Sequence, residues 1–193
     1  MALLLTGCRV SEVGGARWRE FDLQRDQLWS IPAERFKMNA IHRVPLTDTM
    51  LALLGSLPHW AAGDCVFTTN GEKPFNGFST SKRLLDRRAC RLWRAIGHNR
   101  GIDRRHAVME PWCLHDLRRT VRTRLAALRV PDAVAEMVIG HGRKGIQRVY
   151  DQHQYLNEMR AALKEWNAAL MAIVFPPPPN VIPLETRKRA RGR

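Results

Sequence analysis

Long apolar runs are missing from this chain of 193 residues. No stretch approaches the roughly 18 consecutive apolar residues that a membrane-spanning helix requires. Cysteines are few and scattered, at positions 8, 65, 90 and 113, and no two are spaced as Cys-x-x-Cys. A disulfide framework or a structural zinc site normally shows closer, regular spacing. These absences argue against a membrane protein and against a disulfide-stapled secreted module, and we expect reduced thiols in the cytoplasm.

Acidic residues are also in short supply. The chain has 18 Asp and Glu against 32 Lys and Arg, which gives a formal net charge of +14. Its hydrophobic content of 45% is ordinary for a folded domain. A strongly basic soluble domain is typical of proteins that bind polyanions, above all nucleic acids.

The positive charge gathers between Ser81 and Arg105, where nine basic residues stand against two acidic ones. Spacings of three and four residues place several of them on one face of a helix. Such a face either points to solvent or contacts phosphates, and the missing acidic partners make phosphate contact at least as good an interpretation. The candidate DNA-binding residues are Lys82, Arg83, Arg87, Arg91 and Arg94.

Alternating and β-branched residues predict a small antiparallel sheet. The runs at 27–31 and 41–46 form two strands with a hairpin tip at 37–40 that carries Lys37, and 65–68 is a third short strand. Helical patterns occupy most of the remaining chain, at 1–7, 11–18, 48–57, 77–97, 114–128, 131–139 and 155–171. The expected fold class is therefore mainly α with a small antiparallel β-sheet (α+β).

The C-terminus differs in composition from the rest of the chain. Four prolines at 176–179 cannot continue a helix, and five of the last seven residues are basic. We expect one domain at 1–174, followed at 175–193 by a Pro-rich linker and a disordered basic tail. That tail either touches a DNA backbone without reading sequence or has no role.

Four short motifs carry the candidate chemistry. Arg9 directly follows a Thr-Gly-Cys turn at a helix start, and His115 and Arg118 lie three residues apart on one helix face. A glycine precedes His141 at the end of a short helix, and Tyr150 follows His141 by nine residues. Each motif is weak alone, since a single buried histidine is more often structural than functional. In this order and spacing the motifs resemble the catalytic domain of the tyrosine recombinases, the phage integrase family.

The resemblance extends from residue 1 to about 172 and includes the runs HDLRRT and VY-x-x-H, which are typical of prophage integrases. It implies the tyrosine-recombinase catalytic-domain fold and a cleavage and rejoining of DNA that needs no metal and no cofactor. By resemblance, Tyr150 is the nucleophile that forms a 3′-phosphotyrosyl link, and His115 assists the movement of the proton of the Tyr150 hydroxyl. The guanidiniums of Arg9 and Arg118 clamp the phosphate, and His141 donates a further hydrogen bond.

Three further roles follow from the same resemblance. Lys37 matches the general acid that protonates the departing 5′-oxygen. Glu12 orients a basic residue, and Asp116 is a supporting residue. Tyr155 is the alternative nucleophile, but it lies too far beyond His141. Lys73 and Lys82 are the alternative general acids, but neither lies between two strands.

Full-length integrases of this family carry an N-terminal helical domain that clamps DNA. This chain starts almost directly before the first arginine, so we expect it to lack the opening helices of the catalytic domain and any clamping domain. The expected partner is a double-stranded DNA attachment site, with self-association into a synaptic tetramer when the protein is full length. The resemblance also implies a mobile element or prophage and a bacterial cytoplasmic, nucleoid-associated location.

Other interpretations remain open. Residues 116–139 have the outline of a helix-turn-helix, which would make the chain a non-catalytic DNA-binding regulator. A type IB topoisomerase-like enzyme would share the nucleophile and the arginine clamp but relax DNA without exchanging partners. A zinc site is a poor candidate, because its ligands would be irregularly spaced, at Cys113, His115, His141 and His153.

Overall fold

The computed structural model describes residues 1–103, 106–141 and 155–176. Three short strands form one sheet: β1 (Phe21–Asp22), β2 (Leu28–Ile31) and β3 (His42–Pro45). Two 3-10 turns precede β1 and follow β2: η1 (Trp18–Glu20) and η2 (Ala33–Arg35). The α-helices are α1 (Ala2–Thr6), α2 (Val10–Gly14), α3 (Asp48–Gly55), α4 (Phe78–Asn99), α5 (Leu114–Ala127), α6 (Asp132–Val138) and α8 (Leu156–Val174). The predicted fold class, mainly α with a small antiparallel sheet, is confirmed.

The sheet has the order β1-β2-β3, and both strand pairs are antiparallel. Trp29 pairs with Val44 and Ile31 with His42, so β2 and β3 form the predicted hairpin, with Lys37 in the turn that joins them. Trp29 and Ile31 are buried, whereas the residue between them is half-buried. This alternation places one face of the sheet on the core, as the period of a β-strand requires.

Two expectations about local structure are wrong. Residues 65–68 are not a strand: Cys65 forms one isolated bridge with Arg17, and the third strand of the sheet is β1. The Asp22 carboxylate accepts three backbone N–H bonds from the residues that follow it, and this turn folds the chain back into β2. The helix expected at 11–18 is shorter than predicted: α2 has Arg9 as its N-cap and ends at Gly14.

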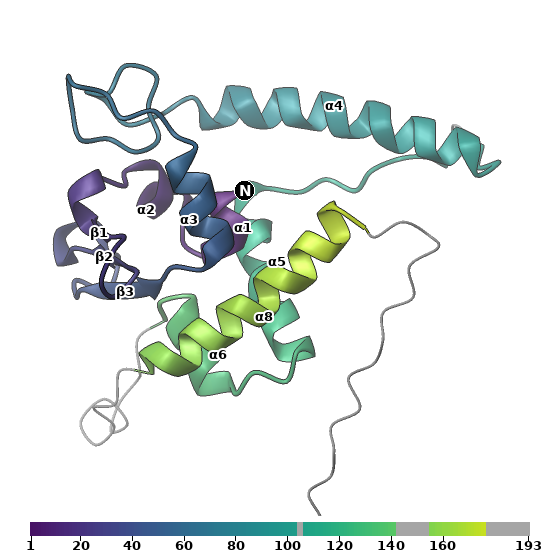
Figure 1. Ribbon diagram of the computed structural model, residues 1–193. Coiled ribbons are helices and arrows are strands. Elements are labelled where there is room, and N and C mark those ends of the chain that lie inside the picture. The colour runs from purple at the N-terminus through teal and green to yellow at the C-terminus, as the bar shows by residue number, and fades with distance from the viewer. Residues whose placement is uncertain (104–105, 142–154, 177–193) are drawn as a thin grey trace, which may run out of the picture.

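One hydrophobic core joins the sheet to the helices. α8 crosses the middle of the molecule, packed against α6 and β3 (Figure 1). Its buried positions Met159, Leu163, Trp166 and Leu170 recur at spacings of three and four, as expected for one side of a helix. The indole Nε1 of Trp166 donates a hydrogen bond to the Leu4 carbonyl (2.6 Å), which ties α8 to α1. This core holds α1, α5 and α6, the helices next to the candidate catalytic residues.

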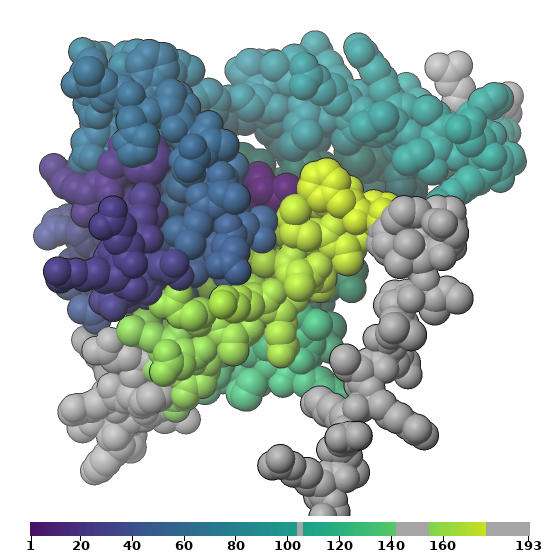
Figure 2. Space-filling model, viewed as in Figure 1, coloured from purple at the N-terminus to yellow at the C-terminus, as the bar shows by residue number. Residues whose placement is uncertain are grey.

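Helix α4 stands apart from this core. It runs along the top of the molecule and extends well beyond the other helices (Figures 1 and 2). Gly97 is the single buried residue among its 22, all of which are described. None of the helices in the described ranges combines the length and apolar character needed to cross a lipid bilayer. The tail predicted at 175–193 lies outside the described residues from residue 177 onward.

Candidate active site

The turn between α1 and α2 places the first candidate arginine. Gly7 ends α1 with a φ of +67°, and a Cβ there would lie 3.1 Å from Cγ1 of Val121 on α5. Glycine adopts this left-handed conformation without strain and lets α1 approach α5 closely. The chain then turns so that Arg9 becomes the N-cap of α2. The sequence feature Thr-Gly-Cys-Arg thus specifies both the turn and the position of the arginine.

Glu12 holds Arg9 in place through two hydrogen bonds. Its Oε2 accepts the backbone N–H of Arg9 and its Oε1 accepts the guanidinium Nη1, each at 2.7 Å. Glu12 is only 1% exposed, so its carboxylate is a buried charge that needs this partner. The Arg9 guanidinium also lies over the ring of Phe36, 5.6 Å from the ring centroid. These contacts hold the Arg9 guanidinium in one orientation.

Arg118 approaches the same place from α5. It is 4% exposed, and its Nη1 donates a hydrogen bond to the Gly7 carbonyl (2.8 Å). Its buried Nη2 has no hydrogen-bond partner among the described residues. The Gly7 carbonyl belongs to the turn that leads into Arg9, so Arg118 is held beside that turn. Burial, and secondly the positive charge of Arg9, lower the pKa of Arg118. Such a pair of cations with an unpaired N–H suits an anion.

His141 is positioned by the end of α6. Gly140, with a φ of +67°, donates its N–H to the Met137 carbonyl (3.0 Å), and the N–H of His141 bonds to the Glu136 carbonyl (2.9 Å). This is the Schellman pattern of a helix C-terminus, and it requires glycine at the left-handed position. The His141 ring bonds through Nδ1 to the Glu136 carboxylate at 2.7 Å. Backbone and side chain of Glu136 therefore both hold His141.

The Glu136 carboxylate has a second partner, the cation of Arg122. Its other oxygen accepts a hydrogen bond from Nε of Arg122 (2.7 Å), and Arg122 also pairs with Asp132 (2.9 Å). Burial by itself would raise the pKa of Glu136, but the hydrogen bonds from Arg122 and His141 outweigh it and lower the pKa. Glu136 is therefore ionised near neutral pH and remains an acceptor for His141.

The remaining predicted residues lie at the protein surface or outside the described part of the chain. Lys37 is exposed in the β2–β3 turn, and His115 is exposed in the first turn of α5, one turn before Arg118. Asp116 accepts the backbone N–H of Cys113 (2.7 Å), which lowers the pKa of its carboxyl and caps α5. Tyr150 lies outside the described residues.

Two residues buried beside Arg9 and Arg118, His42 and Phe36, are not identified by the sequence motifs. The His42 ring stacks on the Phe36 ring, with 4.8 Å between centroids and an interplanar angle of 18°. Burial lowers the pKa of His42 to about 4, so the imidazole is uncharged near neutral pH. The sequence signal for His42 is a histidine at an inward-facing position of a strand whose other residues on that face are apolar.

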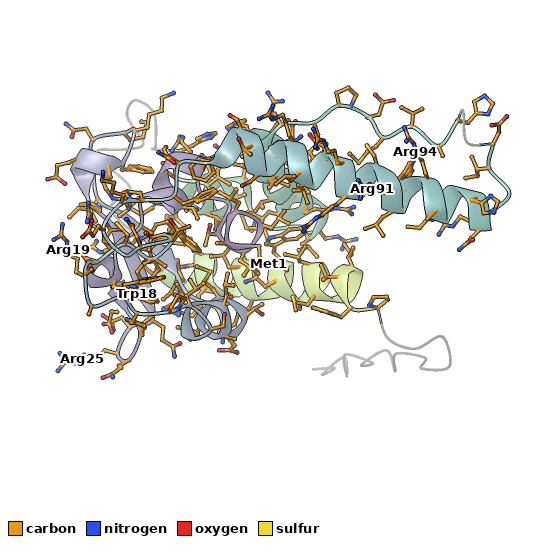
Figure 3. The ribbon with its side chains drawn as sticks, turned by 90° about the horizontal axis from the view of Figure 1, so that it is seen from above. Met1, Trp18, Arg19, Arg25, Arg91 and Arg94 are labelled. Atoms are coloured by element: carbon orange, nitrogen blue, oxygen red, sulfur yellow. The ribbon has the colours of Figure 1, made fainter. Side chains whose placement is uncertain are left out.

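The predicted DNA-binding residues on α4 differ in their surroundings. The Lys82 ammonium pairs with both Asp86 oxygens at 2.7 Å and lies 3.9 Å from the ring centroid of Trp112. Its charge is therefore partly neutralised by contacts within the protein. The four arginines are exposed along the helix, at positions 83, 87, 91 and 94. Figure 3 shows two of them, Arg91 and Arg94, far from Arg19 and Arg25 at the other end of the molecule.

A metal centre finds no support in the part of the chain that the structure describes. No three His, Cys, Asp or Glu side chains gather there in a way that could hold a metal ion. Of the zinc ligands considered from the sequence, Cys113, His115 and His141 lie in this part of the chain, whereas His153 lies outside the described residues.

Comparison with protein families gives a match over most of the chain. The model of the phage integrase family matches residues 1–157, which include both arginines, the hairpin, His141 and Tyr150. The chain belongs to the phage integrase family. This membership confirms the family resemblance that the motifs predict, and it does not favour a non-catalytic helix-turn-helix regulator.

Several curated proteins are similar to this integrase-family chain. The prophage integrase IntA of Escherichia coli (strain K12) is 29% identical over 167 residues, which cover 84% of this chain and 36% of the relative. The integrase of Enterobacteria phage P4 is 28% identical over 178 residues, which cover 84% of this chain and 37% of the phage protein. The chain thus spans little more than a third of the length of these two relatives.

Solved structures of the Tn1549 transposon integrase, in complex with circular intermediate DNA, share the fold. One has a TM-score of 0.56 at 15% sequence identity, covering 85% of this chain and 56% of that chain. A second has a TM-score of 0.51 at 16% identity, covering 82% and 54%. At this level of identity the likeness concerns the fold, and the roles of single residues need their own argument.

Proposed function

We propose that this integrase-family chain is the catalytic part of a site-specific recombinase that cuts and rejoins DNA strands through a 3′-phosphotyrosyl intermediate. The observation that supports it best is the placement of two arginines at one turn: Arg9 begins α2, and Arg118 on α5 bonds to the carbonyl of Gly7, two residues before Arg9. The substrates would be double-stranded attachment sites, and the full-length protein would assemble on them as a synaptic tetramer. Its place of action would be the bacterial cytoplasm, on the nucleoid.

The arginine pair suits the transition state of such a reaction. A phosphodiester under attack gains negative charge on its non-bridging oxygens, and preorganised donors stabilise that charge without reorganising. Glu12 and the Gly7 carbonyl each occupy one nitrogen, Nη1, of Arg9 and Arg118 respectively. Both guanidiniums are thereby held in orientation. The Nη2 of Arg118, which has no partner among the described residues, is the proposed donor for a phosphate oxygen.

Strand cleavage in this proposal forms one bond and breaks another. The phenolic oxygen of Tyr150 attacks phosphorus, and the bond from phosphorus to the 5′-oxygen breaks. His115 assists removal of the phenolic proton, and Lys37 gives a proton to the 5′-oxygen, which leaves as a hydroxyl. His141 bonds to Glu136 through Nδ1 and, with protons on both ring nitrogens, donates through Nε2 to a non-bridging oxygen. Rejoining is the reverse reaction, with a 5′-hydroxyl as the attacking group.

A nicked suicide substrate tests the function directly. Cleavage beside the nick releases a short DNA end that diffuses away, so the protein stays attached to the 3′ side. We expect a protein–DNA adduct that survives boiling in detergent and disappears on protease digestion. Binding without any such adduct, under conditions where the attachment site is fully occupied, would contradict the proposal.

Lys37 should become dispensable when the leaving group needs no proton. Lys37→Ala should cut an ordinary substrate about 100-fold or more slowly, because it lacks the proton donor. A substrate whose bridging 5′-oxygen is replaced by sulfur releases a thiolate, which is a far weaker base than an alkoxide. The variant should therefore cleave the sulfur substrate nearly as fast as the parent protein. A variant that is equally slow on both substrates would assign Lys37 to phosphate binding or hairpin folding.

The exposed arginines of α4 should contribute to DNA affinity through charge. The double variant Arg91→Gln and Arg94→Gln should weaken binding and make the salt dependence shallower. Each lost phosphate contact removes about 0.9 from the slope of log K against log salt, so the expected change is roughly 2. Arg19→Gln with Arg25→Gln, at the opposite end of the molecule, removes the same charge and is the matched control (Figure 3). Equal slopes for the two double variants would mean that α4 does not contact DNA.

A further inference from the structure

His42 is a buried titratable group that the proposed mechanism does not use. It begins β3, is 6% exposed, and lies among charges from two neighbouring helices: Glu12 and Arg9 of α2 and Arg118 of α5. Its ring donates a hydrogen bond to the Val138 carbonyl, and its buried Nε2 has no partner among the described residues. Burying an unpaired nitrogen costs stability that a phenyl ring would avoid, so packing alone does not account for a histidine here.

The contacts of His42 join two segments that carry catalytic candidates. Its ring lies against Phe36 at the end of η2, and its nitrogen bonds to α6. At the end of α6, a Cβ on Gly140 would lie 2.7 Å from Cζ of Phe36 and 3.0 Å from Nε2 of His42. Because Gly140 has no side chain, the turn after α6 packs directly against both rings. The β2–β3 hairpin is fastened to the end of α6 by this packing.

Phe36, His42 and Gly140 pack together close to residues with proposed catalytic roles. Lys37 follows Phe36 in the chain, and His141 follows Gly140. Arg9 lies over the same Phe36 ring that His42 stacks on. A turn that bears an exposed lysine has few other constraints, because the neighbouring residues 38–41 are all exposed. The Phe36 and His42 rings are thus the buried anchor nearest to Lys37.

We propose that His42 is a positioning residue: by stacking on Phe36 and bonding to the end of α6, it fixes the hairpin so that Lys37 reaches the departing 5′-oxygen. This inference rests on the proposed function. In this proposal, His42 itself touches neither DNA nor the reacting atoms. Its replacement should mainly remove the benefit of the general acid, since a reacting group displaced by about an ångström loses most of its effect.

The sulfur substrate separates this role from a merely structural one. His42→Phe keeps a ring of similar size but loses both nitrogens. It should cut the ordinary substrate about 10- to 100-fold more slowly, and it should recover to near the parent rate on the 5′-sulfur substrate. Combined with Lys37→Ala it should add little further loss on the ordinary substrate, because both changes affect the same step. His42→Leu, which removes the ring stack and leaves Phe36 in place under Arg9, should show the same recovery.

Val44→Ala is the matched control. Val44 is buried in the same strand, β3, but pairs with Trp29 away from the stack. Its truncation should lower thermal stability and leave the ratio of sulfur to oxygen cleavage rates at the parent value. Should His42→Phe fail to fold, His42→Leu alone carries the comparison. Slow cleavage of both substrates by a folded His42→Phe or His42→Leu, alongside full recovery by Lys37→Ala, would overturn the inference and leave the proposed function intact. Failure of Lys37→Ala to recover would overturn the acid assignment and this inference together.

Discussion

Tyr150→Phe should abolish the covalent protein–DNA adduct on a nicked suicide substrate. Without the phenolic oxygen no bond to phosphorus can form, so the expected effect is complete loss of adduct, while DNA binding changes little. Tyr150 lies nine residues after His141, and the match to the phage integrase family extends over both residues. The measurement is the fraction of labelled DNA retained with protein in a denaturing gel.

Tyr155→Phe is the natural control, since the chain has two tyrosines. Tyr155 is the N-cap of α8, has a φ of +52° and packs against the core, so its place in the fold is structural. Removing its hydroxyl should leave the adduct yield close to that of the parent protein. The opposite pattern, with adduct lost in Tyr155→Phe and kept in Tyr150→Phe, would reassign the nucleophile.

Arg118→Lys should reduce strand cleavage by about 100-fold or more, which is the usual cost of removing a preorganised donor to a developing oxyanion. The Arg118 guanidinium bonds to the Gly7 carbonyl through Nη1, and Nη2 on the same rigid plane has no partner among the described residues. A lysine ammonium is a point charge and cannot reproduce this fork. Arg9→Lys should behave alike, because Glu12 holds the Arg9 fork in the same manner. DNA affinity should fall much less than the cleavage rate.

Arg119→Lys tests whether the effect depends on position. Arg119 is the next residue on α5, but its side chain is 73% exposed and pairs with Asp116. Exposed pairs of this kind contribute little, so cleavage should stay within about twofold of the parent rate. Comparable losses of binding and cleavage in Arg118→Lys would instead point to an ordinary phosphate contact.

Much of the local structure follows from the sequence. The periodic apolar pattern of α8 and the alternating pattern of β2 and β3 predict these elements to within a few residues. Glycine at positions 7 and 140 predicts helix ends, and both residues have the positive φ that this role requires. These features depend on neighbours close in the chain, where residue type and spacing carry the information.

Other expectations failed or could not be formed from local patterns. The strand predicted at 65–68 is absent, because the edge of the sheet is instead occupied by β1, which the Asp22 turn folds back onto β2. Lys82 looks like one more basic residue of α4, yet it faces Asp86 and the ring of Trp112. Trp112 is distant in sequence, and no periodicity reveals such a contact.

The sequence by itself determined the family, the helical character of the chain, and the types and order of the candidate catalytic residues. Only the tertiary structure decided that Arg118 bonds to the Gly7 carbonyl beside Arg9, and that His42 lies buried between the hairpin and α6. The physical reason is the range of the interactions. Caps and periodic faces arise among residues within a few positions of each other, whereas burial and the meeting of charges depend on how α1, α5, α6 and the sheet pack together.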